Sequence, residues 1–565
     1  MPESELFQQR VSPADLAVTY YLDNFESLLS EVYALYGDLL SDEEVSFYRD
    51  FKALSEPARC LYVRMLSRKG DWFRSDKLSY SEIPDINAAA TELERSRFIE
   101  IFSLQSKMPF PENTEYAITC LALFTKPELL AALKDHPLNL NLKEAKGLSK
   151  DALVARLISE FKDGTYRDIS DWAQYLPECD LYSVFGSEET ETYRLLFFGN
   201  LYQDMTDFVL RDLGIYQYED YPLDKQSRWC QNREQLEAHR SYYNARQALG
   251  DLRDASSEEL LQAAESIPDT YDPLLKRKCY RFINDIARQL ERLKSNDMAL
   301  TVYEKSARHP ARERRLRVLI NHGRDDEAEA LAGSMLDSPW SEEERQFLID
   351  FIPRKLKFAT SLCQRIEEHL SPVTTDVLTM PAENRLELGV ERAVVTELEK
   401  QGDQLIYCEN LLIPGVFGLV FWPAIFAPVA GAFFHPFQFA PADLNDEAFV
   451  VSREMEIAQC FKVLESQQAL TDHVLETFLS KSGRTNPFVH WGFLSEEIIR
   501  LAISRIPLDH WKACFEFLLK DLRHHRAGLP DLIRFPEEGG YELIEVKGPG
   551  DTLQKNQKAW LAEFA

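Results

Sequence analysis

The sequence predicts a multidomain, mainly α-helical protein that ends in an α/β domain with a mixed sheet. Its 565 residues exceed what one hydrophobic core can organise, so roughly three or four domains of about 150 residues each are expected. Helical periodicity dominates most of the chain, whereas two short apolar strands joined by a turn appear near the C-terminus. The composition, with 45% apolar and 12% aromatic residues, is that of a chain that folds.

We expect four domains in order along the chain. They are an N-terminal helical region at 1–120, a small helical module at 121–165, helical repeats at 166–375 and the α/β domain at 376–565. The nine cysteines are scattered singly, and the N-terminus lacks the basic and apolar regions of a secretory signal. We therefore expect an intracellular protein in a reducing compartment.

Basic residues cluster in the N-terminal region. Arg64, Arg68, Lys69, Arg74 and Lys77 lie within fourteen positions. The cluster is either a face that contacts a DNA duplex or the solvated side of a helix, and its spacing alone does not decide. The net charge of −29 does not favour DNA binding. A DNA strand, however, responds to the charge of a basic groove that lies within a Debye length of it. We count all of these residues except Arg68 as candidate DNA contacts.

A helical hairpin is predicted in the second domain. Thr125 and Glu128 match a capping box at the start of its first helix. At the turn before its second helix, backbone N–H groups lie beside the ammonium groups of Lys146 and Lys150, an arrangement that can hold a phosphate. The segment resembles a SAP module, which is a small DNA-binding helical hairpin.

The third domain shows weak internal repetition. The segment NDMAL at 296–300 recurs as DDEAEAL at 325–331, an offset of about 30 residues that is near the period of tetratricopeptide-like helix pairs. A dense run of basic residues lies between Lys276 and Arg317. This surface would follow a nucleic-acid backbone or bind an acidic protein.

Residues 411–434 are apolar and long enough to span a bilayer. Pro414, Pro423 and Pro428 would each remove a helix hydrogen bond, and no second spanning segment exists to compensate. We therefore predict a buried, broken segment and no membrane span. Glu409 directly precedes this segment and is close to the candidate site residues described next, but we do not count it among them.

Two predicted strands near the C-terminus carry the residues that indicate chemistry. Asp531 precedes the apolar run 532–535, and a second strand over 541–547 has Glu545 and Lys547 on one face. If the strands pair, Asp531 reaches the same point, and two converging carboxylates suit Mg²⁺ or Mn²⁺. Lys547 would position or deprotonate an attacking water, or neutralise charge developing on a phosphate. The alternative is an edge strand whose polar residues merely point outward.

Two helices beside these strands carry further candidates. Glu391 lies on the apolar side of a helix predicted at 386–400, where it faces a metal-bound water or pairs with a basic residue. Gln557, on a helix after the second strand, would hold the substrate or water, or make an interhelical hydrogen bond.

Basic residues also precede Asp531. Arg523, His524 and Arg526 form either a clamp for a DNA phosphate or a solvated charge run, and they have no ligand spacing for zinc.

These motifs resemble a known nuclease family. GVERAVVTEL, GLPDLIRF and ELIEVKGPGD, which contain Glu391, Asp531 and Glu545, occur in the order seen in the VRR-NUC domain of the PD-(D/E)xK superfamily, whose fold is restriction-endonuclease-like. With the LYVRMLSRKGDW segment, the SAP-like hairpin and the helical repeats, the whole chain resembles the Fanconi-anaemia-associated nuclease family.

The resemblance implies a structure-specific DNase that cuts near 5′ flaps in branched DNA, degrades DNA from 5′ to 3′ and helps unhook interstrand crosslinks. It also implies that Asp531 and Glu545 bind the Mg²⁺ or Mn²⁺ directly, that the Val546 carbonyl completes the site and that Glu391 acts through water. Eukaryotic relatives carry a ubiquitin-binding zinc finger, for which no Cys/His cluster is evident here. We therefore expect a bacterial member that is cytoplasmic and nucleoid-associated, whereas a eukaryotic one would be nuclear.

Two other interpretations stay open. In the first, the chain is a noncatalytic DNA-binding scaffold of helical repeats with a vestigial nuclease fold. In the second, it is a metal-dependent nuclease that acts on RNA.

Overall fold

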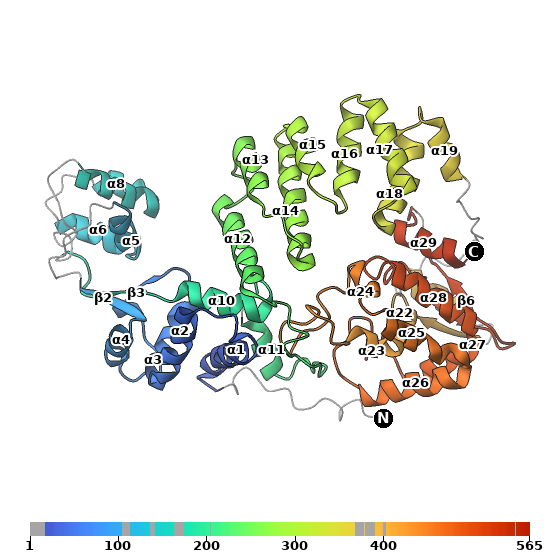
Figure 1. Ribbon diagram of the computed structural model, residues 1–565, viewed down its shortest axis with the longest axis horizontal. Coiled ribbons are helices and arrows are strands. Elements are labelled where there is room, and N and C mark those ends of the chain that lie inside the picture. The colour runs from blue at the N-terminus through green and yellow to red at the C-terminus, as the bar shows by residue number, and fades with distance from the viewer. Residues whose placement is uncertain are drawn as a thin grey trace. The chain divides into compact units, whose positions relative to one another are not determined.

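The computed structural model describes residues 17–103, 114–135, 142–162, 175–203, 205–367, 378, 390–398, 403–548 and 550–564. The chain divides into two compact units, Met1–Gly214 and Ile215–Ala565. Within the described residues both are mainly helical, and each contains one small sheet (Figure 1).

The first unit contains a three-stranded antiparallel sheet. Its central strand is β3 (Asp180–Val184), which pairs with β1 (Trp72–Arg74) and β2 (Ile99–Ser103). Tyr182 lies opposite both Phe73 and Ile101. The helices near this sheet in the chain are α1 (Tyr20–Tyr36), α2 (Asp42–Ala53), α3 (Glu56–Leu66), the 3₁₀ turn η2 (Ser75–Lys77), α4 (Ile86–Arg95), α10 (Ser187–Phe198) and α11 (Thr206–Asp212).

The SAP-like segment forms a helical module with its own apolar core. Its helices are α5 (Thr114–Ala122), α6 (Lys126–Asp135), α7 (Leu142–Gly147) and α8 (Lys150–Lys162). Leu121, Phe124 and Leu157 are buried in this core. The predicted capping box is present, because the Glu128 carboxylate accepts the Thr125 backbone N–H at 2.7 Å and the Thr125 hydroxyl oxygen accepts the Glu128 backbone N–H at 3.4 Å.

The first unit differs from the sequence expectation in two respects. The N-terminal region, predicted to be helical, contains β1 and β2, and the helical repeats begin later than residue 166 because β3, α10 and α11 belong to this unit. β3 occupies the middle of the sheet, more than 70 residues from either partner strand. Such long-range pairing leaves no mark on local periodicity.

The helical repeats open the second unit and stand side by side in a row (Figure 1). They are α12 (Arg233–Leu249), α13 (Ser257–Ser266), α14 (Pro273–Arg292), α15 (Asn296–Glu304), α16 (Ala311–Asn321), α17 (Asp325–Asp337), α18 (Glu342–Lys355) and α19 (Thr360–Glu367). Leu316, Met335, Leu348 and Ile352 are fully buried in the core shared by the later helices.

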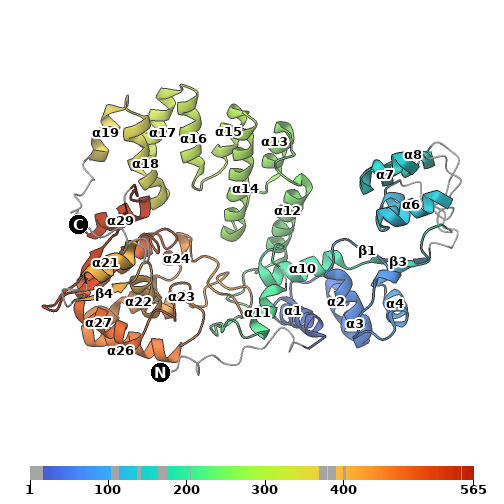
Figure 2. The ribbon, with the colours of Figure 1, turned by 180° about the vertical axis from the view of Figure 1, so that it is seen from behind.

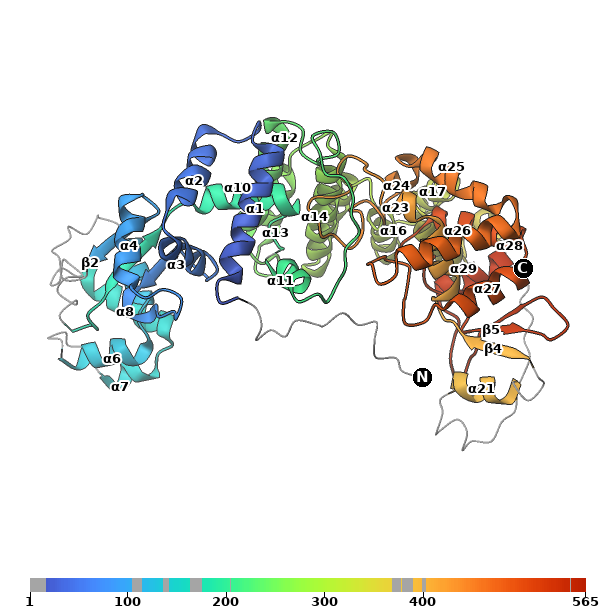
Figure 3. The same ribbon diagram turned by 90° about the horizontal axis from the view of Figure 1, so that it is seen from below.

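The C-terminal domain packs its helices around a second three-stranded sheet, seen from two further sides in Figures 2 and 3. Its elements are α21 (Val390–Leu398), β4 (Gln404–Tyr407), α22 (Leu412–Val420), α23 (Trp422–Ile425), α24 (Ala448–Val451), α25 (Glu454–Phe461), the 3₁₀ helix η4 (Lys462–Glu465), α26 (Gln467–Ser480), α27 (Glu496–Arg505), α28 (Leu508–Lys520), β5 (Leu532–Phe535), β6 (Glu542–Ile544) and α29 (Lys555–Phe564).

The predicted mixed sheet is antiparallel throughout its described strands. β5 lies in the middle, with Ile533 opposite Ile406 of β4 and Leu543 of β6. The turn between β5 and β6 is too short for a parallel crossover, so it forces an antiparallel hairpin. The prediction of a mixed sheet is therefore wrong for these strands.

The apolar segment 411–434 is buried and broken, as predicted. Every residue of α22 is buried, and the chain turns at Phe421 before the short helix α23. No helix within the described ranges is long and apolar enough to cross a membrane.

The segment that precedes α12 is bound to the C-terminal domain. The Glu219 carboxylate accepts hydrogen bonds from Trp422 Nε1 at 3.1 Å and from Lys481 Nζ at 2.8 Å. Tyr221 stacks on Phe433 with ring centroids 3.8 Å apart. These contacts link the start of the second unit to its C-terminal domain.

Replacing Glu219 tests this link. Glu219→Ala should destabilise the protein by about 2 kcal/mol, because the indole N–H of Trp422 loses its acceptor in a buried site. The neighbouring Asp220→Ala serves as the control, since the Asp220 side chain is 92% exposed and its pair with Arg484 contributes little. Thermal unfolding of both variants measures the difference, and equal melting temperatures would contradict the assignment.

Candidate active site

The register of the β5–β6 hairpin positions the two predicted carboxylates. Leu532 lies opposite Ile544, so the same register extended by one residue sets Asp531 opposite Glu545. Residues directly opposite in an antiparallel pair project from the same face. Ile544 and Val546 pack on the other face, against Leu532. The hairpin thus places Asp531 and Glu545 together on one face and Ile544 and Val546 on the other, as the alternation predicted.

Hydrogen bonds tie the polar side chains together. Asp531, only 8% exposed, accepts the Val546 backbone N–H on Oδ2 at 2.8 Å. Glu545 Oε1 accepts both Lys547 Nζ at 2.6 Å and Gln557 Nε2 at 2.7 Å. The structure therefore brings together four predicted residues, from the hairpin and from α29.

Burial and neighbouring charges shape the electrostatics of this cluster. Burial raises the pKa of Glu545, and the negative charges of Asp531 and Glu409 add to that rise, while the hydrogen bond from Lys547 opposes it. Burial lowers the pKa of Lys547, but the hydrogen bond to Glu545 and the nearby carboxylates raise it above its ordinary value overall. The two carboxylates thus form a negatively charged cluster with one ammonium group, that of Lys547, beside it.

The donor set suits a hard divalent cation. Two carboxylates on one face, with a backbone carbonyl at Val546 between Glu545 and Lys547, are oxygen ligands of the kind that Mg²⁺ and related ions prefer. No group of three His, Cys, Asp or Glu side chains suitable for a metal gathers among the described residues. The side chain of Glu391, the third acidic residue predicted for the site, lies outside them, although its helix α21 forms as expected.

Arg523 and His524 line a cavity in the second unit. It measures about 840 Å³ and lies between the repeats and the loop before Asp531. His524 pairs with Glu343 at 3.1 Å and with Asp521 at 2.9 Å. Neither Arg523 nor Arg526 forms an ion pair with a carboxylate within the described part of the chain. The other charged residues that line the cavity are Lys276, Arg277, Arg308, His309, Glu342, Asp446, Glu447 and Lys520.

The predicted DNA-binding residues of the first unit differ in their surroundings. Arg74 is buried and binds Asp76 and Glu128, so it links the sheet to the SAP-like module. Arg64 pairs with Glu82 at 2.6 Å. Lys77 lies 3.3 Å from the Glu128 carboxylate and 3.5 Å from Asp76, with its side chain half exposed. The geometry gives Arg74 a structural role.

The remaining three candidates of the first unit are lysines at turns. Lys69 and Lys146 are exposed, and Lys150 is half-buried, where its ammonium donates to the Ala122 carbonyl. Sequence reasoning gave no role to Lys126, whose ammonium donates to the Lys146 and Leu148 carbonyls and closes the turn of the module. Its position at the start of α6 gave no signal for that contact.

Comparisons with known proteins identify the class. A model of the VRR-NUC domain matches residues 465–565, and a model described as "FAN1, HTH domain" matches residues 19–100. These matches define the class, a metal-dependent, structure-specific nuclease, and the hairpin with its two carboxylates and lysine, followed by the glutamine helix, is its candidate active site.

Whole-chain similarity then specifies the family. The chain is 36% identical over 553 residues to the Fanconi-associated nuclease 1 homolog of Pseudomonas aeruginosa, covering 97% of this chain and 94% of that one. The human Fanconi-associated nuclease 1 is 24% identical, with 96% of this chain but 61% of the human one covered. A crystal structure of paFAN1 bound to 2nt 5′flap DNA with gap matches with a TM-score of 0.74 and 34% identity, over 97% of this chain and 96% of that one. The chain belongs to the Fanconi-associated nuclease 1 family.

The His524 ion pairs predict a pH-dependent stability. Hydrogen bonds to Asp521 and Glu343 raise the pKa of His524 from 6.5 to about 9. Because the folded pKa is the higher one, the stabilisation is complete below about pH 6.5 and disappears as the pH rises through 9. His524→Gln should therefore lower the melting temperature at pH 6 but not at pH 10. His322→Gln, at an exposed position after α16, is the control. A deficit for His524→Gln that is independent of pH would contradict the charged pairing.

Proposed function

We propose that the protein hydrolyses one phosphodiester bond near the junction of 5′-flap or other branched DNA, degrades DNA further from 5′ to 3′ and acts in the repair of interstrand crosslinks. The observation that carries this proposal is the meeting of Asp531, Glu545, Lys547 and Gln557 at one end of the hairpin. The relative solved with 5′-flap DNA supports the choice of substrate.

Each side chain then has a defined task. Asp531, Glu545 and the Val546 carbonyl would hold a Mg²⁺ or Mn²⁺ ion, with Glu391 acting through water. A divalent ion at this point supplies Lewis-acid stabilisation of charge that develops on the phosphoryl oxygens. Lys547, already paired with Glu545, fits neutralisation of that charge or orientation of the attacking water. Gln557 orients Glu545 and contacts the substrate or the water.

DNA would be selected by shape through its backbone. Arg523, which lines the cavity together with protonated His524, and Arg526 would bind phosphates next to the cleavage site. Arg64, Lys69, Lys77, Lys146 and Lys150 stay candidates for contacts to the duplex. For Arg74, a structural role is favoured by its two buried ion pairs.

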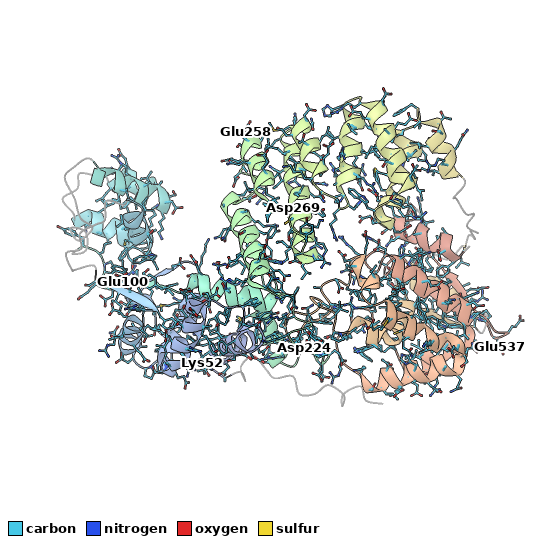
Figure 4. The ribbon with its side chains drawn as sticks, in the orientation of Figure 1. Lys52, Glu100, Asp224, Glu258, Asp269 and Glu537 are labelled. Carbon is cyan, nitrogen blue, oxygen red and sulfur yellow. The ribbon has the colours of Figure 1, made fainter. Side chains whose placement is uncertain are left out.

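The charge change Glu545→Gln tests the catalytic site. Incision of a labelled 5′-flap DNA in Mn²⁺ or Mg²⁺ should fall at least about 100-fold, because Glu545 is proposed as a direct ligand and the loss of an outer-shell partner alone costs up to about 100-fold. The melting temperature should stay near that of wild type, because Gln557 keeps an acceptor at this position. Glu537→Gln is a matched control at the exposed, projecting tip of the same hairpin and should cut normally (Figure 4).

Asp531→Ala and EDTA should each abolish incision as well. Binding of the flap without incision by wild type would favour the noncatalytic scaffold. Faster cleavage of a matched RNA flap than of the DNA flap would favour the RNA nuclease.

The proposed phosphate contacts of Arg523 can be tested through the salt dependence of DNA binding. Arg523→Ala should weaken flap binding for all sequences and reduce the slope of log Kd against log salt by about 1. Arg500→Ala is the control, because Arg500 lies exposed on α27 and pairs with Glu496. An unchanged salt slope for Arg523→Ala would show that Arg523 does not contact a phosphate.

A role in crosslink repair further requires that the protein acts on chromosomal DNA in the cell. We expect a bacterial, cytoplasmic and nucleoid-associated protein. Sensitivity of a deletion strain to a crosslinking agent, complemented by wild type but not by Asp531→Ala, is the test of that role.

A further inference from the structure

A turn next to β4 lies against the segment that carries Asp531. Residues Cys408–Leu411 form the turn, which is closed by a 2.9 Å hydrogen bond from the Leu411 N–H to the Cys408 carbonyl. Its third residue, Asn410, has a φ of +54°. Only glycine, and among L-residues chiefly asparagine and aspartate, adopts this left-handed conformation readily. The backbone therefore restricts which residues fit position 410.

The Asn410 side chain makes a contact that a turn by itself does not need. Its Oδ1 accepts the Leu529 backbone N–H at 3.0 Å. Pro530 has no N–H, so the Leu529 N–H is the nearest backbone donor upstream of Asp531. The Asn410 side chain thus accepts the last backbone N–H that precedes Asp531.

Other contacts hold the same segment on either side of the Asn410 hydrogen bond. The Cys408 N–H donates to the Asp531 carbonyl at 2.9 Å, which continues the β4–β5 pairing (Figure 3). Leu529 is buried against the apolar residues after the turn, including Leu412. On its far side Gly528, at φ +90°, lies so close to Asn556 of α29 that a Cβ there would come within 2.6 Å of its backbone. The segment is held between the turn and the helix that carries Gln557.

We propose that Asn410 is a positioning residue, whose amide oxygen fixes the Leu529–Asp531 segment and thereby the Asp531 carboxylate at the metal site. The inference rests on the proposed function in one respect, namely that Asp531 binds the ion. Asn410 itself touches neither substrate nor ion in this role. Its action runs through the backbone of Leu529.

Two substitutions separate the side chain from the turn. Asn410→Gly keeps the left-handed turn without strain but removes the acceptor. Asn410→Asp keeps both the acceptor and the tolerance of positive φ, and it adds a negative charge beside Glu409, whose own charge acts on Glu545. Asn410→Ala loses the acceptor and adds strain, so it should also melt at a lower temperature.

The first experiment is amide hydrogen exchange on the full chain without metal. In Asn410→Gly the peptide that contains Leu529 should exchange about fivefold to tenfold faster than in wild type, the factor expected for one net hydrogen bond. Asn410→Asp should exchange at the wild-type rate. Wild-type exchange in Asn410→Gly, or equal acceleration in Asn410→Asp, would overturn the proposal.

The second experiment is calorimetric titration of the same proteins with Mn²⁺ alone, with Asp531→Ala as the reference for loss of the site. Asn410→Gly should bind Mn²⁺ severalfold more weakly than wild type, and Asn410→Asp should bind it at least as tightly as wild type does. Faster exchange with unchanged Mn²⁺ affinity would overturn the positioning role, because the loop would then have loosened without moving the ligand. If wild type fails to cut flap DNA while both readouts change as expected, the proposed function fails and the role of Asn410 stands.

Discussion

The hydrogen bond from the Val546 N–H to the Asp531 carboxylate is the interaction on which the site depends. It lies at the open end of the β5–β6 hairpin and continues the register that pairs Leu532 with Ile544. A slip of one residue would move Glu545 to the face away from Asp531 and bring Val546 to the face of Asp531. Packing of the partly buried Ile544 and Val546 against Leu532 opposes that slip and so keeps Asp531 and Glu545 on one face.

The site is also held from outside the sheet. Helix α29, which carries Gln557, buries Trp560, and the indole N–H of Trp560 donates to the His525 carbonyl at 2.8 Å. On the side of the repeats, Lys558 lies 3.9 Å from Asp350 of α18, and Lys555 lies over the Phe347 ring. Figure 1 shows α29 beside α18. The repeats thus help to support a helix of the candidate active site, in addition to lining the cavity before it.

Local pattern predicted much of the C-terminal domain. The run Leu532–Phe535 is a strand as expected, because a short apolar run bounded by a proline and a turn usually forms a strand. The alternation after residue 541 likewise placed Glu545 and Lys547 together, and the capping box at Thr125 was readable from two residues. These features depend on neighbours in sequence, which is why a single chain reveals them.

Features that depend on distant contacts were missed or predicted wrongly. The burial of Arg74 follows from Glu128, which lies in another helix, and spacing alone made Arg74 look like an exposed DNA contact. The central place of β3 and the binding of Glu219 to Trp422 join segments far apart in the chain. Asn410 gave no signal either, since its partner is the backbone of Leu529. Its positive φ becomes visible only in three dimensions.

The most direct test of the account is to locate Mn²⁺ by anomalous diffraction in crystals of the protein with 5′-flap DNA. We expect a peak about 2.1 Å from oxygens of Asp531 and Glu545 and from the Val546 carbonyl, the distance usual for a small divalent ion. The peak should lie beside a phosphate of the DNA. A bound flap whose Mn²⁺ lies elsewhere, with Asp531 and Glu545 turned away from any ion, would contradict the account.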